Sequence, residues 1–181
     1  YFDAEFNFGG LIGLSEHEMQ KFSLKSSTDK YFRIFPRLYW ASGLTVLTRF
    51  DEVFYYAEMT AMGLNNDYVR GYEYYVIPSR HFLLQKNNLK FEILQPKVFR
   101  LPWIKTDKFA KVPVSLYVNA FFDHANSWAY PGVTDDLNNQ YQFGYGLGLD
   151  LVTYYDKVFR LEYSINRFNE NGLFLHFTAP I

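Results

Sequence analysis

The chain contains no cysteine, so neither a disulfide framework nor a thiolate metal site can form. It also has no run of about 18 uncharged apolar residues, which excludes a transmembrane helix. The formal net charge is only −1, and acidic and basic residues are interspersed. Because a nucleic-acid-binding protein needs a basic face, we expect no nucleic acid among the partners.

A recognisable catalytic or metal-binding arrangement is missing as well. The four histidines are scattered, without the H-E-x-x-H or other paired spacing that binds a metal. We therefore predict that the protein is not an enzyme and uses neither a metal nor another cofactor.

Aromatic residues are abundant, with 19 Phe and 16 Tyr among 181 residues. The length fits one domain with enough apolar residues for a core. A low overall hydropathy is compatible with a membrane β-barrel, because only alternate residues of its strands face lipid.

Much of the sequence alternates apolar and polar residues, the period of a β-strand. The pattern is clearest near the end, where alternate residues of 141–151 and 159–166 are apolar. It predicts roughly eight strands, no helix, and an all-β antiparallel meander. We expect a turn at Ser26–Lys30 and strands at 2–8, 31–40, 44–50, 53–62, 89–93, 114–122, 141–151, 159–165 and 172–177.

The segment at about 63–88 is too irregular for a strand and carries Arg70 beside Gly71. Loops of this length are usually functional or disordered. This one is too rich in aromatic residues to be disordered. We therefore expect a functional loop and ask which group pairs with Arg70.

A sheet with one apolar and one polar face can belong to a soluble barrel or, inverted, to a membrane barrel. The charges of Arg160 and Glu162 at mid-strand favour the inverted arrangement. So do the short turns, such as Tyr155–Lys157, that alternate with long loops. Bulky aromatics also crowd the predicted strand ends, as in interfacial girdles: Tyr31, Trp40, Phe99, Trp103, Tyr141, Tyr154 and Tyr155. A transmembrane barrel is favoured, and a soluble ligand-binding barrel stays open.

Three stretches, in this order, resemble the C-terminal barrel half of the bacterial surface-antigen family, the outer-membrane assembly factors (BamA-like). They are Val69-Arg70-Gly71-Tyr72, the run Phe121-Phe122-Asp123-His124-Ala125, and the run from Glu170 to Phe177. The first is similar to the family's V-R-G-F/Y loop motif. The second is similar to its F-x-D-x-G motif, with Ala125 in place of glycine. The third fits its terminal β-signal through Glu170, Gly172, Leu175 and Phe177, although the chain continues to Ile181.

The resemblance implies that residues 1–181 are the C-terminal part of one outer-membrane barrel, half of a 16-stranded one. It implies a loop that folds inward, with Arg70 meeting Asp123 and Phe121 as the motif's aromatic residue. The implied function is the assembly and insertion of outer-membrane proteins. The implied partners are outer-membrane lipids, unfolded client proteins and accessory subunits. A translocation or secretion pore, or an anchor barrel of the same superfamily, remains an alternative.

The residues add their own expectations to the resemblance. A buried guanidinium needs a carboxylate partner, and Asp123 lies on the polar face of its predicted strand. Glu92, on the polar face of the strand after the loop, is expected as a second acceptor. The glycine stripe Gly144, Gly146 and Gly148 on the polar face should leave room for a returning loop.

Overall fold

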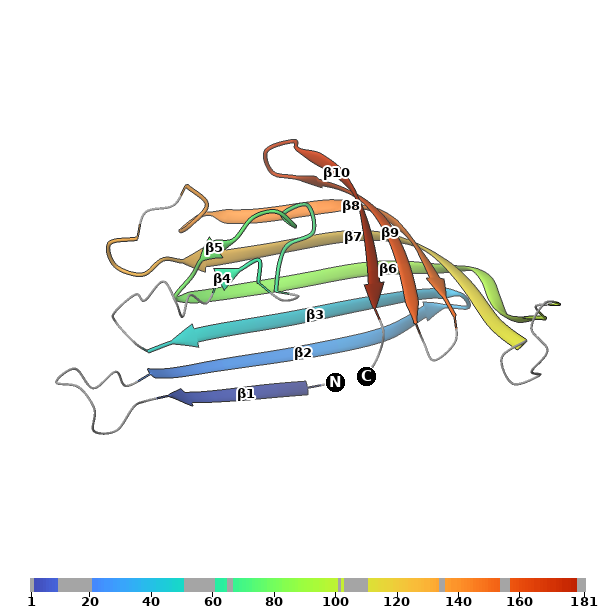
Figure 1. Ribbon diagram of the computed structural model, residues 1–181, viewed down its shortest axis with the longest axis horizontal. Helices are drawn as coiled ribbons and strands as arrows, with labels where there is room; N and C mark the ends of the chain where they lie inside the picture. Colours follow the sequence, from blue (N-terminus) through green and yellow to red (C-terminus); the bar gives the residue numbers. More distant parts are fainter. Residues whose placement is uncertain are drawn as a thin grey trace.

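The computed structural model describes residues 2–9, 21–50, 61–64, 67–100, 102, 111–133, 136–153 and 157–178. Eight strands form one antiparallel sheet in chain order, and two short strands pair separately (Figure 1). The strands of the sheet are β1 (Phe2–Gly9), β2 (Lys21–Phe35), β3 (Leu38–Arg49), β6 (His81–Arg100), β7 (Lys111–Trp128), β8 (Tyr141–Val152), β9 (Val158–Asn166) and β10 (Asn171–Thr178). The short pair is β4 (Ala61–Met62) and β5 (Ile77–Pro78).

The predicted all-β antiparallel meander is confirmed, and the described residues contain no helix. The pairing of the strands does not by itself close the sheet into a barrel. Within the described residues β1 pairs only with β2, and β10 pairs only with β9, so the sheet has two free edges.

Several predicted boundaries are wrong, because the strands are longer than the alternation indicates. The polar run Ser26–Lys30 is part of β2, where each residue pairs with β3. The turn lies instead at Pro36 and Arg37, and Arg37 adopts a positive φ of 70°. The long loop ends before His81 rather than at residue 88, since β6 already begins there. The strand predicted at 53–62 lies almost wholly outside the described residues.

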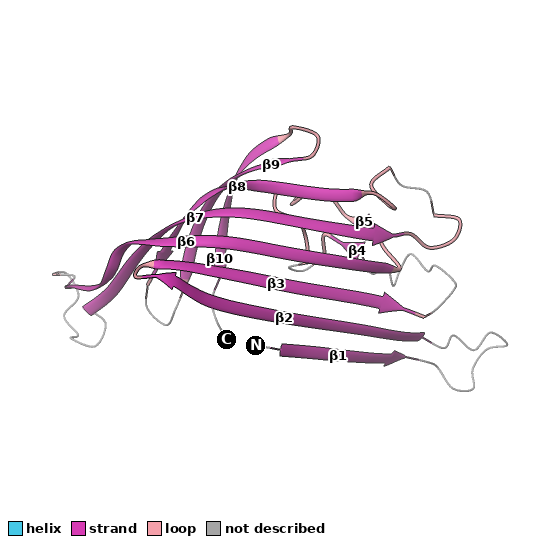
Figure 2. Cartoon of the chain, turned by 180° about the vertical axis from the view of Figure 1, so that it is seen from behind, coloured by secondary structure: helices cyan, strands magenta, loops and turns pink. Residues whose placement is uncertain are grey.

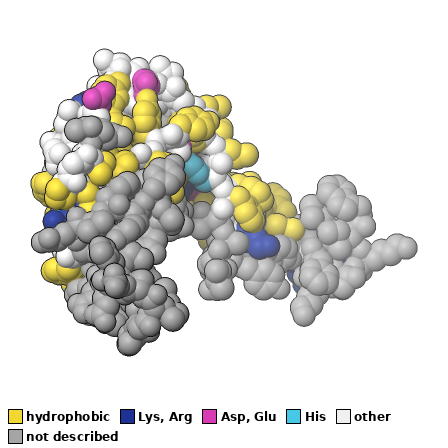
Figure 3. Space-filling model, turned by 60° about the vertical axis from the view of Figure 1, so that its left-hand side comes forward, with side chains coloured by type: hydrophobic (Ala, Val, Ile, Leu, Met, Phe, Trp, Pro, Cys, Tyr) yellow, Lys and Arg dark blue, Asp and Glu magenta, His cyan; other side chains and the backbone are white. Residues whose placement is uncertain are grey.

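The two faces of the sheet differ in chemistry, and the apolar one is exposed. Alternate residues of β8, β9 and β10 expose large apolar side chains, among them Leu147 and Leu175, which are 60% and 75% exposed. The intervening residues of β8 and β9 are glycine or polar and mostly buried, including Asp150, Glu162 and Asn166. Figure 3 shows apolar side chains spread over much of the described surface in that view. This distribution is the reverse of a soluble sheet, which buries its apolar face.

The predicted aromatic girdle is exposed where it is described. Tyr31, Trp40, Phe99 and Tyr141 are all exposed to solvent. The rings of Phe32 and Trp40 stack, with centroids 5.4 Å apart. Trp103, Tyr154 and Tyr155 lie outside the described residues.

The sheet is curved, and the segment that carries β4 and β5 lies on the same side of it as β10. Both lie in front of β6–β8 in Figure 1 and behind them in the opposite view of Figure 2. Toward the end of the sheet where this segment enters, the inner face is apolar rather than polar. There a buried cluster joins the segment to β3, β6 and β7: Leu47, Met62, Val69, Tyr72, Ile77, Phe82, Leu84 and Ala125.

Candidate functional site

The segment from Asp67 to Tyr75 is a compact chain of turns rather than an extended loop. Backbone hydrogen bonds join Tyr72 N–H to the Val69 carbonyl and Tyr75 N–H to the Tyr72 carbonyl, each at 3.0 Å. Val69 and Tyr72 are buried in the apolar cluster, on either side of Arg70. The segment therefore holds Arg70 from both sides and aims it at the polar inner face.

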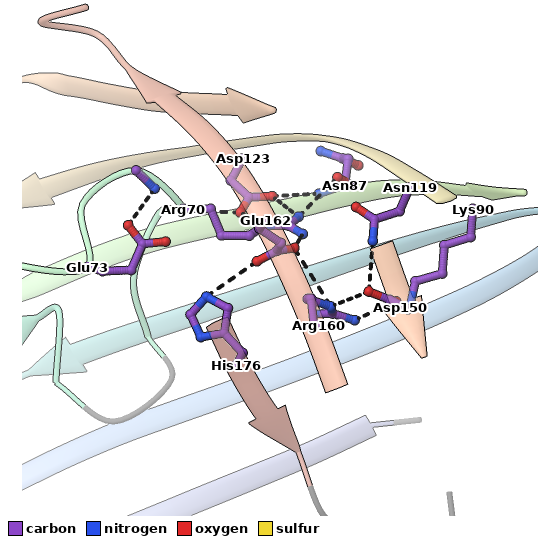
Figure 4. A network of polar contacts seen from close by, with 11 residues as sticks. Arg70, Glu73, Asn87, Lys90, Asn119, Asp123, Asp150, Arg160, Glu162 and His176 are labelled. Atoms are coloured by element: carbon purple, nitrogen blue, oxygen red, sulfur yellow. Dashed lines mark hydrogen bonds and ion pairs between the residues drawn. The ribbon is translucent and has the colours of Figure 1, made fainter. Parts of the chain in front are cut away.

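Arg70 makes its main contacts with two carboxylates, and all three side chains are almost completely buried. Its Nε donates to Asp123 Oδ2 at 2.6 Å, and its Nη2 donates to Asp123 Oδ1 at 2.7 Å. Its Nη1 donates to Glu162 Oε1 at 2.9 Å. Figure 4 shows the guanidinium between these groups, which come from β7 and β9. The structure thus brings Arg70 and Asp123 together in the two-pronged geometry that a planar guanidinium favours.

The environment of this arginine explains how a buried charge is tolerated. Burial alone lowers the pKa of Arg70, but the hydrogen bonds and negative charges of Asp123 and Glu162 outweigh burial and raise it. Arg70 Cζ also lies 3.8 Å from the centroid of the Phe121 ring, a cation–π contact. Phe121 is therefore part of the site. Removing one partner of such a buried pair typically costs about 3–5 kcal/mol.

Glu92 is not the second acceptor, and that prediction is wrong. Asp123 pairs with Lys86 across β6 and β7, whereas Glu92 pairs with Tyr117. Glu92 therefore lies farther along β6, by roughly 20 Å at the rise of a β-strand. Its carboxylate accepts a hydrogen bond from the Tyr117 hydroxyl at 3.4 Å. Glu162, two strands away from Asp123 in the sheet, takes the role instead.

A second charged cluster lies beside the first on the inner face. Asp150 on β8 accepts from Lys90 Nζ at 2.6 Å, from Arg160 Nε at 2.7 Å and from Asn119 Nδ2 at 2.8 Å. Arg160 Nε also lies 3.7 Å from Glu162 Oε1, which links the two clusters. The buried inner face is thus a connected network of paired charges (Figure 4).

The glycine stripe has different neighbours at its three positions. A Cβ at Gly144 would collide with the backbone carbonyl oxygen of Arg70, so this glycine makes room for the loop as predicted. At Gly146 the obstacles are the Tyr163 carbonyl oxygen and the Phe121 ring. At Gly148 they are the side chains of Asn119 and Glu162. Only Gly144 therefore admits the loop backbone directly.

Tyr68 and Glu73 complete the inner side of the loop. Burial, together with the negative charges of Glu73 and Glu162, raises the pKa of the Tyr68 hydroxyl to about 12. The ring thus stays neutral at physiological pH, and Lys86 Nζ lies 4.6 Å from its centroid. Glu73 Oε2 accepts the Gly71 N–H at 2.8 Å, and burial raises the pKa of Glu73.

The terminal stretch divides between a turn and an edge strand. Glu170 lies in the β9–β10 turn, and Gly172 is the second residue of β10. Leu175 and Phe177 point to the exposed apolar face. Glu170 and Asn166 also contact the loop, and no local sequence pattern predicts these contacts. The sequence does indicate that Glu162 and Asn166 face inward, because both lie on the polar face of their strand.

The described residues contain no group of His, Cys, Asp or Glu arranged to hold a metal ion. No described helix is long and apolar enough to cross a membrane. Comparisons of the chain with protein-family models, curated proteins and solved structures found no match.

Proposed function

We propose that this chain is part of a transmembrane β-barrel of the bacterial outer membrane that assembles and inserts other outer-membrane proteins. The observation that carries the proposal is the inverted burial of the sheet. Its outer face exposes leucine, phenylalanine and tyrosine, while its inner face buries charged groups that pair with an internal loop. Lipid is the solvent in which such an outer face is stable.

The size of the inner space supports a barrel with more strands than this chain supplies. An eight-stranded barrel has an interior just wide enough to be filled by side chains or one small ligand. Here the inner face accommodates a folded loop and, beside it, a cavity of about 640 Å³ lined by charged residues such as Lys86, Arg160 and Glu162. Further strands would continue the sheet from β1, and the first strand of the complete barrel would close on β10 through a seam that can open. The expected 16-stranded barrel fits this arrangement.

The free edge of β10 supports the insertion function. An unpaired strand edge templates an incoming strand by β-augmentation. Pairing at such an edge satisfies backbone groups of a client before they enter lipid, where each unsatisfied group costs several kcal/mol. No covalent chemistry is needed. The outward residues of β10, Leu173, Leu175 and Phe177, would let the paired edge remain in lipid.

Two other functions remain as alternatives. A translocation or secretion pore, or an anchor barrel of the same superfamily, would share the inverted sheet and the inner network, but would not need a strand edge that accepts clients. A soluble ligand-binding barrel would require the apolar face to be buried, which the exposure of Leu147, Leu149 and Leu161 disfavours.

The membrane part of the proposal is tested by extraction and migration. The protein should leave the membrane fraction only with detergent, and it should migrate differently on a gel before and after boiling. Ready solubility without detergent would contradict it.

The insertion part is tested in liposomes. Vesicles that contain the purified protein should accelerate the folding of a urea-denatured outer-membrane barrel added from solution. Vesicles with an unrelated barrel at the same density serve as the control. Equal folding rates in the two preparations would refute the insertion function and leave the pore or anchor alternatives.

A further inference from the structure

Asn166, the last residue of β9, is a hub for hydrogen bonds at the tip of the β9–β10 hairpin. Its Oδ1 accepts the backbone N–H groups of Phe168 and Glu170, each at 3.0 Å. Its Nδ2 donates to Glu170 Oε2 at 2.7 Å and to the backbone carbonyl of Gly71 at 3.1 Å. The side chain is buried and its amide atoms are satisfied. One amide therefore fixes the turn and ties it to the internal loop.

Glu170 makes a second connection between the same two parts. The Tyr75 hydroxyl lies within hydrogen-bonding distance of both carboxylate oxygens of Glu170, at 3.0 Å and 2.8 Å. Gly71 allows the close approach, since its φ is 98° and a Cβ there would lie 3.3 Å from the Asn166 Cβ. The contact between loop and hairpin thus uses residues that are about 95 positions apart in the sequence.

Further contacts between the loop and the hairpin follow the same line. Arg70 binds Glu162 on β9. The Tyr72 and Phe168 rings, and the Tyr68 and His176 rings, lie 6.3 Å apart. The loop therefore lies against the hairpin from β9 through the turn to the inner face of β10.

We infer that Asn166, Glu170 and Tyr75 form a latch that fastens the β9–β10 hairpin to the internal loop and so holds the edge strand β10 in position. Within the described residues β10 pairs only with β9, whereas β9 also pairs with β8, so a single ladder of backbone hydrogen bonds holds β10. Contacts on its inner face and at its tip therefore decide how firmly it is held. These contacts would hold β10 in position whether or not the protein inserts other proteins.

The latch should respond to acid in a defined direction. Hydrogen bonds from Asn166 and Tyr75 lower the pKa of Glu170. A carboxylate with a lowered pKa stabilises the folded arrangement above its unfolded pKa, and that stabilisation is lost as the pH falls through the folded pKa. The Tyr72 hydroxyl also interacts with the charge of Glu170. Arg167, in the same turn as Glu170, donates instead to the Tyr141 carbonyl.

The test is amide hydrogen exchange of the full chain, comparing Tyr75→Phe with Tyr74→Phe. Tyr75→Phe removes one hydroxyl and should speed exchange of 171–178 by roughly two- to tenfold, the effect of one hydrogen bond. The Tyr74 side chain is 88% exposed, and its ring contacts that of Phe174. Because phenylalanine keeps this ring contact, Tyr74→Phe should leave exchange unchanged. Residues 111–128 of β7 serve as an internal reference. Unchanged protection of β10 in Tyr75→Phe, or equal effects of the two substitutions, would overturn the inference.

A pH profile separates a latch from a general packing effect. After correction for intrinsic exchange, protection of 171–178 should fall as the pH drops through the pKa of Glu170. This step should be smaller in Tyr75→Phe, which keeps the hydrogen bond from Asn166 to Glu170, and absent in Glu170→Gln. At neutral pH Glu170→Gln should keep more protection than Glu170→Ala. A step of the same size in Tyr75→Phe as in the unsubstituted chain would contradict the latch.

Discussion

The outer and inner faces of β8 and β9 share the same backbone hydrogen bonds, yet they require different kinds of side chain. Outward positions such as Leu147 and Leu149 are defined by being apolar and exposed. Inward positions such as Asp150 and Glu162 each have named partners at hydrogen-bonding distance. The outer face should therefore tolerate exchange among apolar residues, and the inner face should not tolerate loss of a single charge.

The largest effect should come from breaking the inner pair. Asp123→Ala leaves Arg70 buried without its main partner, so it should lower the free energy of unfolding by about 3–5 kcal/mol. Urea unfolding in lipid vesicles measures this change. The double variant Arg70→Ala/Asp123→Ala should cost less than the sum of the single variants, because both remove one interaction. Strict additivity would mean that the two residues do not meet.

The next effect should come from placing a charge on the outer face. Leu149→Arg should cost about 2–4 kcal/mol if this position lies near the middle of a bilayer. Leu149→Ile, which keeps the position apolar, is the matched control and should be nearly neutral. The same unfolding assay applies to both variants. A stable Leu149→Arg protein in lipid would show that the outer face does not contact the hydrocarbon core.

Alanine substitutions in the glycine stripe should have smaller effects on stability, and these effects should differ between Gly144 and Gly148. Gly144→Ala directs a Cβ at the Arg70 carbonyl oxygen and should cost about 1–3 kcal/mol by overpacking. It should also release the loop, which limited proteolysis within 63–80 detects. A Cβ at Gly148 meets the side chains of Asn119 and Glu162, which can shift, so the loop should be cleaved less in Gly148→Ala than in Gly144→Ala. Equal cleavage of the two variants would argue against a specific role for Gly144.

The sequence allowed the strands and their faces to be predicted wherever alternation was regular, as in β8 and β9. It failed where alternation is interrupted. Residues 81–84 place Leu83 outward between Phe82 and Leu84, so the start of β6 shows no period of two. The polar run at Ser26–Lys30 has the composition of a turn, and only its pairing with β3 makes it a strand.

Only one of the two carboxylate partners of Arg70 could be predicted from the sequence. Asp123 was expected from its face and from the resemblance to the family motif. Glu92 and Glu162 both lie on the polar face, and local sequence does not distinguish them. The choice depends on the register of several neighbouring strands, which brings Glu162 to the loop and leaves Glu92 beside Tyr117. Side-chain pairings across a sheet are a property of that register rather than of any one strand.

The most direct test of the inverted sheet is a cysteine scan of the protein reconstituted into lipid vesicles, which the absence of cysteine from the sequence makes clean. Single cysteines carrying a fluorescent label at 145, 147, 149 and 151 should be quenched by brominated lipid. Labels at the inward positions 41 and 45 of β3, which line the cavity, should escape that quenching. Quenching confined to the outward positions is the result that our account predicts. Uniform access of water-soluble quenchers to Tyr145, Leu147, Leu149 and Leu151 would contradict it.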